Sequence, residues 1–448
     1  MNRTNASRRV SFAAALLLTV VPGTGRAADL VSIYQEALLR DSTYSAARYQ
    51  RQASQEKLPQ GLAGLLPAAS AAANTQYNDR TINFRAPGIA PLNSQYNSNF
   101  WNVSITQPLF RMQNWEAYRQ GKIQVALAEA QFVQATQDLM LRVSQAYFDI
   151  LLAGQDLALA RASKAAFAQQ FEQAKRNFEV GTATITDANN AQAQFDLSVS
   201  TEIGAINTLE VRKEALTRII ARPAPELKRL SAGFEARLPE PNNMDRWVET
   251  AVQAALPVQI AQATADFQSR EVDRNRAAHY PTLDAFASYS DNASGAATAT
   301  NIGNDTRSGV IGLTLAIPLY QGGLVNSRVR EAAALQDKTR QDLESAKRQA
   351  SFDTRQAFLG VTNGAAQVRA LEQAVISTQT SLDSTKLAKE VGIRTEVDVL
   401  LATQQFFQAQ RDLANAKYVY ANSVLRLKAA AGALTEADLL AVNRWFAP

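Results

Sequence analysis

The eight residues Val180–Asp187, V-G-T-A-T-I-T-D, return at Val391–Asp398 as V-G-I-R-T-E-V-D. Each stretch begins with a glycine that can end a helix in the left-handed conformation. Three residues later comes a threonine that can cap the next helix, and an aspartate after a further three completes a capping box. The two stretches therefore predict two helix–turn–helix hairpins, 211 residues apart in the same chain.

The same spacing relates residues on both sides of the turns. Gln145–Tyr147 returns as Gln356–Phe358, and Gln107–Phe110 (Q-P-L-F) matches Ile317–Tyr320 (I-P-L-Y) at an offset of 210. This period is far longer than the 20 to 50 residues of solenoid repeats. The chain is therefore expected to be a duplicated half-protein.

Each half is expected to contain a helix of about 35 residues, two short strands, a very long helix and a shorter helix. The predicted helices are Leu30–Ala63, Asn114–Val180 and Thr184–Ala221 in the first half, and Met244–Ala278, Val325–Val391 and Thr395–Ala431 in the second. At ~1.5 Å per residue the long helices span about 100 Å. The fold class is therefore mainly α with a small β part.

A coiled-coil seam runs along the first long helix with 4-3 spacing, and only Lys164 in it is polar. Its residues are Leu139, Val143, Ala146, Ile150, Ala153, Leu157, Ala160, Lys164, Phe167, Phe171, Ala174 and Phe178. A period of 3.5 sustained over this length predicts supercoiled helix packing. Periodicity alone leaves a soluble coiled coil as an alternative.

The expected boundaries follow from these elements. The repeats are placed at 28–221 and 244–431, joined by an irregular linker at 222–243 that contains four prolines and lies at the side of the helices. Residues 432–448 form a similar irregular tail. Residues 1–27 combine four arginines and no acid with a short apolar run, which is typical of a secretory signal peptide, so the mature chain is expected to begin near Ala28.

Composition excludes most enzyme chemistry. The chain has no Cys and one His, His279, which rules out thiolate catalysis, disulfides and multi-His metal sites. The Gly322-Gly323 pair is not followed by the Lys-Ser/Thr of a phosphate-binding loop. Without residues 1–27 the chain has 42 basic and 41 acidic residues, so its high pI does not indicate nucleic-acid binding. We expect no enzyme activity, metal, cofactor or nucleic-acid partner.

Three segments alternate between apolar and polar residues, as tilted membrane strands do over about 10 residues, and a fourth, Ala68–Tyr77, is rich in Ala and less clear. The clearest apolar faces consist of Trp101, Val103 and Ile105 and of Leu313 and Leu315. A small soluble sheet packed on helices explains the same alternation. If the strands do span a bilayer, these five side chains contact lipid, and the polar segments 79–97 and 292–305 are extracellular loops.

Four strands cannot close a barrel, and an open sheet edge cannot lie in lipid. Membrane strands in this chain therefore require several copies, and three copies supply 12 strands. A secreted protein with such strands belongs in a Gram-negative outer membrane, with its long helices in the periplasm.

Over about residues 28–432, the order, doubling and spacing of these motifs resemble the TolC family of outer-membrane efflux and type I secretion channels. The resemblance implies a homotrimer with a 12-stranded transmembrane barrel and a tunnel of long helices. It also implies docking to a periplasmic adaptor and to an inner-membrane ABC or proton-driven transporter. Many efflux members are lipidated at an N-terminal Cys, so this chain looks more like the unlipidated branch. The alternative is a soluble periplasmic coiled-coil adaptor.

The resemblance also implies a gate where the hairpin turns meet at the periplasmic mouth. The matching positions are Asp187, Arg394 and Asp398, with Arg394 able to bridge to Asp187 and Asp398 able to form an acidic ring that attracts cations. The turns themselves are built by Gly181, Thr184, Gly392 and Thr395. Two positions depart from the family pattern, because Lys389 stands where the family has a gating tyrosine and Leu401 where it has a second acid.

Overall fold

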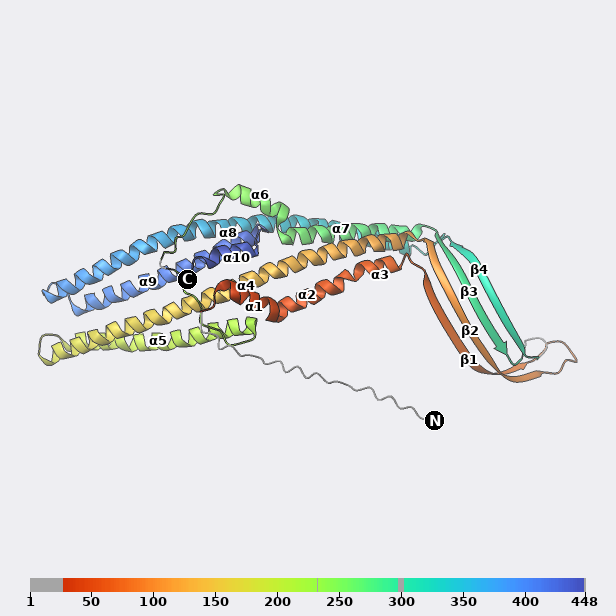
Figure 1. The fold of residues 1–448 in the computed structure, drawn as a ribbon, viewed down its shortest axis with the longest axis horizontal. Coiled ribbons are helices and arrows are strands. Elements are labelled where there is room, and N and C mark those ends of the chain that lie inside the picture. Colours follow the sequence, from red (N-terminus) through yellow and green to blue (C-terminus); the bar gives the residue numbers. More distant parts are fainter. Residues whose placement is uncertain (1–26, 232, 297–301, 447–448) are drawn as a thin grey trace, which may run out of the picture.

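The computed structural model describes residues 27–231, 233–296 and 302–446. Residues 1–26 of the predicted signal peptide lie outside the described residues. Figure 1 shows an elongated molecule in which parallel and antiparallel helices run along most of its length and a four-stranded sheet projects from one end. The two hairpin turns lie at the opposite end.

Two long helices form the body of the molecule. They are α4, Met112–Glu179, of 68 residues and α8, Leu324–Glu390, of 67 residues. Helices α5, Ile185–Ile220, and α9, Glu396–Ala430, fold back along them. At ~1.5 Å per residue each long helix is about 100 Å long, as the sequence predicts.

Most of the predicted seam on α4 is buried. Leu139, Val143 and Ala174 are no more than 1% exposed. The polar seam residue Lys164 instead forms an ion pair of 2.8 Å with Glu202 of α5. The last seam residue, Phe178, is 43% exposed next to the turn.

The predicted single helices of about 35 residues are wrong, because each is divided. The first consists of α1, Leu30–Arg40, α2, Ser42–Gln55, and α3, Lys57–Ala63. The second consists of α6, Met244–Ala254, α7, Leu256–Arg276, and the short 3-10 helix η1, Ala277–His279.

Local chemistry explains the two main breaks. Asp41 has an extended backbone, and its carboxylate accepts a 2.7 Å hydrogen bond from the N–H of Tyr44 at the start of α2. Ala255 is extended as well, and Pro257 follows it in the first turn of α7, where its missing N–H costs no helical hydrogen bond. The divided helices still lie beside α4 and α8 in the half of the molecule nearest the sheet.

The linker and tail meet at the waist of the molecule. Ala28 pairs with Leu227, and Leu230 pairs with Phe446. The tail was predicted to be irregular, but it contains helix α10, Glu436–Asn443. Thr435 and Asp438 form a capping box that starts this helix.

The largest hydrophobic cluster lies under this waist. Tyr147 of α4 is fully buried in it, and its hydroxyl lies 2.9 Å from the Lys228 carbonyl oxygen and 3.2 Å from that of Ala28. Helices α1, α4, α5, α9 and α10 all contribute buried side chains. The waist therefore joins the N-terminal segment, the linker and the tail to both repeats.

The sheet has the antiparallel order β1-β2-β3-β4. Its strands are β1, Ala68–Ile82, β2, Leu92–Phe110, β3, Thr282–Ser294, and β4, Asn304–Ala316. They are longer than the 10 residues predicted, and the predicted loop 79–97 is wrong because both β1 and β2 extend into it. Polar residues continue the backbone ladder there, which needs no apolar side chains.

Phe286 breaks the alternation of β3 by placing an aromatic ring on the polar face. It is paired with Gly312 of β4. A Cβ atom at Gly312 would lie 2.8 Å from the Phe286 ring. The ring therefore covers the space above the glycine, as aromatic residues do when they stabilise a glycine in a neighbouring strand.

Candidate gate and membrane-facing surface

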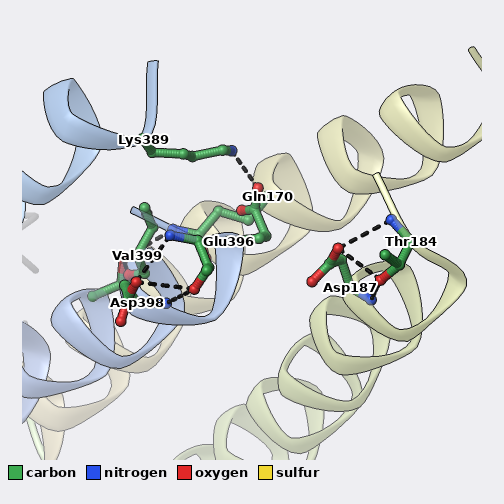
Figure 2. Close-up of polar contacts among 9 residues, drawn as sticks. Gln170, Thr184, Asp187, Lys389, Glu396, Asp398 and Val399 are labelled. Carbon is green, nitrogen blue, oxygen red and sulfur yellow. Dashed lines mark hydrogen bonds and ion pairs between the residues drawn. The ribbon is translucent and has the colours of Figure 1, made fainter. Parts of the chain in front are cut away.

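The two hairpin turns have nearly the same hydrogen bonds. The Thr184 hydroxyl accepts from the Asp187 N–H at 3.2 Å, and the Asp187 carboxylate accepts from the Thr184 N–H at 3.0 Å. At the second turn the corresponding distances between Thr395 and Asp398 are 3.2 and 2.9 Å. Both predicted capping boxes are therefore present (Figure 2).

The glycines end the long helices as the sequence indicates. Gly181 has φ 77° and Gly392 has φ 81°, in the left-handed region that favours glycine. The N–H of Thr182 then donates to the Asn177 carbonyl at 2.8 Å, and the N–H of Ile393 makes the equivalent 2.8 Å bond. This is the 6→1 hydrogen bond of a Schellman motif.

The expected bridge between Arg394 and Asp187 is not formed within one chain. Arg394 instead faces Asp398, four residues farther along, with 3.9 Å between their charged atoms. The Asp187 carboxylate is held by Thr184 in the other hairpin. Among the residues that the structure describes, Asp398 is the only ion-pair partner of Arg394.

Asp398 has a lowered pKa. The causes are hydrogen bonds from the Thr395 backbone N–H and hydroxyl, followed by the nearby charge of Arg394. A carboxyl group with a depressed pKa stabilises the folded state above its unfolded pKa of about 3.9 and loses that contribution as pH falls through the folded value. Asp398 is therefore ionised throughout the neutral and mildly acidic range.

Lys389 does not lie free at the mouth. It forms an ion pair with Glu396, the first residue of α9 (Figure 2). Glu396 is not among the residues predicted for the gate. The sequence does contain a pattern that could have predicted the pair. A lysine in the last turn of one helix and a glutamate in the first turn of the next are each placed favourably for the helix dipole. Leu401 is 51% exposed.

The two hairpins contact each other above the turns through α4 and α9. An apolar cluster of Phe167, Ala174, Ala191 and Leu400 joins them. The Gln170 side-chain amide of α4 also donates to the Thr403 hydroxyl of α9 at 2.9 Å. Movement of one hairpin relative to the other must break this contact.

The sheet presents a row of exposed apolar side chains on one face. Trp101, Val103, Ile105, Leu313 and Leu315 are between 42% and 66% exposed in the single chain. Trp101 packs against Tyr289 of the neighbouring strand, with ring centroids 5.6 Å apart. In the described part of the chain no helix is both long enough and apolar enough to cross a membrane, and no group of three or more acidic, His or Cys side chains is arranged to hold a metal ion.

Comparison with known proteins agrees with this architecture. The family model described as "Outer membrane efflux protein" matches residues 33–222 and 247–433, one segment in each repeat. The chain is 30% identical over 447 residues to the proteases secretion protein PrtF of Dickeya chrysanthemi, covering 96% of this chain and 95% of the relative. It is 33% identical over 419 residues to the outer membrane protein TolC of Vibrio cholerae, covering 93% of each.

A solved structure has the same fold. The Campylobacter jejuni CmeC outer membrane channel superposes with a TM-score of 0.79 at 16% identity, covering 100% of this chain and 98% of that one. Long helical hairpins joined to a small sheet with open edges define a subunit of an oligomeric outer-membrane channel. The chain belongs to the outer membrane efflux protein family. It resides in the outer membrane with its helical tunnel in the periplasm, and the soluble-adaptor alternative is not supported.

Proposed function

We propose that this chain is the outer-membrane exit channel of a type I protein-secretion system. A periplasmic adaptor would connect it to an inner-membrane ABC transporter, and the cargo would cross the periplasm inside the helical tunnel. The observation that supports this proposal is the match to a protease-secretion protein along 96% of this chain and 95% of the relative.

Deletion of the chain in its native host tests this function. Loss of a secreted protein from the medium, restored by the wild-type chain, is the expected result. Drug susceptibility of the same strain measures efflux in parallel, and a change there alone would assign the channel to a proton-driven or ABC drug exporter. Cross-linking and mass spectrometry of the native complex would identify the adaptor and transporter.

We also propose that Asp187, Arg394 and Asp398 close the periplasmic mouth of a homotrimer. Arg394 is 59% exposed at its side chain and only loosely paired within its own chain, at 3.9 Å. In a ring of alternating hairpins, the second hairpin of one chain lies beside the first hairpin of the next. Arg394 is then placed to reach Asp187 of the partner subunit.

Replacing Arg394 by Ser is expected to raise the leak conductance without weakening the trimer. An exposed ion pair contributes only about 0–1 kcal/mol, but three symmetric pairs break together, so the open fraction should rise about tenfold. Single-channel recording in planar bilayers measures this. Arg348→Ser changes an exposed arginine of α8 far from the mouth and is the matched control. Equal leak in both variants would show that Arg394 only shapes the turn.

Replacing Asp398 by Asn is expected to weaken block by divalent cations, because three ionised side chains around one axis attract cations. The lowered pKa of Asp398 keeps the ring charged, so block of the wild-type channel should change little between about pH 5 and 8. Titration of the current with Mg²⁺ measures both effects. Asp412→Asn, on the exposed side of α9, is the control. Block that is unchanged in Asp398→Asn would place the cation site elsewhere.

A further inference from the structure

The second hairpin contains an ion pair across its own turn. Lys389, in the last turn of α8, contacts the carboxylate of Glu396, at the start of α9 (Figure 2). Their side chains are only 19% and 7% exposed. The cation lies at the C-terminus of its helix and the anion at the N-terminus of the next, the arrangement that both helix dipoles favour. The pair therefore ties the two helices together at the turn.

The ion pair faces α4. A groove of ≈ 510 Å³ between α4, α8 and α9 is lined by Lys389, Glu396 and Gln170. One carboxylate oxygen of Glu396 and the amide oxygen of Gln170 are buried without a hydrogen-bond partner. Among the described residues Lys389 is the one ion-pair partner of Glu396, so removal of the lysine leaves a buried carboxylate without an ion pair.

No equivalent ion pair spans the turn of the first hairpin among the residues that the structure describes. At the repeat offset of 211 residues, Lys389 corresponds to Phe178 and Glu396 to Ile185. Both are apolar and partly exposed, at 43% and 52%. The turns share their backbone hydrogen bonds, so the ion pair is an addition confined to the hairpin that carries Arg394 and Asp398.

We propose that Lys389 and Glu396 form a clamp inside the second hairpin that positions Arg394 and Asp398 at the mouth. All four residues lie within the ten positions 389–398, and the clamp fixes the helices on either side of the turn. This inference rests on the proposed gate, because it assigns a positioning role to residues that support it. Lys389 thus acts within its own hairpin, in a groove that α4 of the first hairpin also lines.

The clamp determines how the mouth opens. With α8 and α9 tied at their ends, the second hairpin moves as a rigid unit. The contacts that break are those with α4, including the bond between Gln170 and Thr403. Opening does not require the two helices of the hairpin to separate.

Spin labels test the rigidity directly, because the chain has no cysteine of its own. Leu387→Cys and Leu401→Cys place labels on exposed positions of α8 and α9 beside the turn. In trimers diluted with unlabelled chain, the intra-hairpin distance should be narrow and equal in the wild-type background and in the leaky Arg394→Ser background. It should broaden in Glu396→Gln and stay narrow in Lys386→Met, which changes a neighbouring exposed lysine that has no ion pair among the described residues. A distribution as narrow in Glu396→Gln as in the wild type would overturn the clamp.

A double-mutant cycle tests the consequence for the gate. Lys389→Met and Glu396→Gln should each raise the open probability about tenfold, and the double variant no more than either alone, because both remove the same interaction. If the double variant raised the open probability by the product of the two single effects, the two residues would act independently, and that result would contradict the proposal. Trimer content on a native gel separates misassembly from gating. The spin-label measurement needs no conduction, so the clamp and the channel function can fail separately.

Discussion

Replacing Leu313 by Arg is expected to prevent insertion of the sheet into the outer membrane. Leu313 lies in the middle of the apolar row of β4 and is 66% exposed in the single chain. An arginine facing lipid near the bilayer midplane costs about 2–4 kcal/mol per chain, and a trimer bears that cost three times. The yield of heat-modifiable trimer in the outer-membrane fraction measures the effect.

Thr314→Arg is the matched control, since it places the same charge one residue away on the opposite face of β4. If the row of Leu313 faces lipid, the opposite face lines the interior of the barrel, where a charge is solvated, so normal assembly is expected. If Leu313→Arg inserts as well as Thr314→Arg, the row of Leu313 and Leu315 does not contact lipid.

Replacing Tyr147 by Ala is expected to destabilise the waist by about 3–5 kcal/mol, the usual cost of deleting a buried aromatic ring. Tyr147 is fully buried and packs against Phe446 with ring centroids 5.1 Å apart. Its loss removes the contact shared by the N-terminal segment, the linker and the tail. The expected result is a lower thermal midpoint and faster proteolytic cleavage within residues 222–243.

Tyr147→Phe separates packing from hydrogen bonding. It keeps the ring and removes only the hydroxyl that the Lys228 and Ala28 carbonyls share, so a loss of about 1 kcal/mol is expected. A similar thermal midpoint for the Ala and Phe variants would mean that the ring itself contributes little.

The hairpin turns were predictable because their chemistry is local. A left-handed glycine, a capping threonine and an aspartate three residues later act on their own backbone, and the structure has the predicted dihedral angles and bonds at Gly181 and Gly392. The long helices were predictable for a related reason, since a seam repeated over about 40 residues leaves no other regular structure.

Other elements depended on weak signals. The break at Asp41 follows from a cap within a region of continuous helical character, and it is held in place by an ion pair of 2.9 Å with Arg142 of α4. Helix α10 is only eight residues long and is supported by the waist. The polar ends of β1 and β2 show little apolar alternation, so their pairing could not be read from side chains.

The candidate gate was only partly predictable from the sequence. Family resemblance indicated Arg394 and Asp398 by position, and the structure brings them within 3.9 Å of each other. The ion pair between Lys389 and Glu396 spans a turn, and its burial depends on α4. Contacts between residues on separate helices are set by packing, which a single sequence does not specify.

The duplication has a consequence for the stoichiometry of any partner at the mouth. In the proposed homotrimer the six hairpins would repeat about every 60° in backbone shape, because both turns have nearly the same dihedral angles and the same caps. Their surfaces alternate every 120°, since the first tip exposes Ile185 where the second has the buried Glu396, and the second carries Arg394 where the first has Ala183. A partner made of six identical units would therefore meet two kinds of binding position in equal number. A partner with three-fold symmetry would bind at only one of the two kinds.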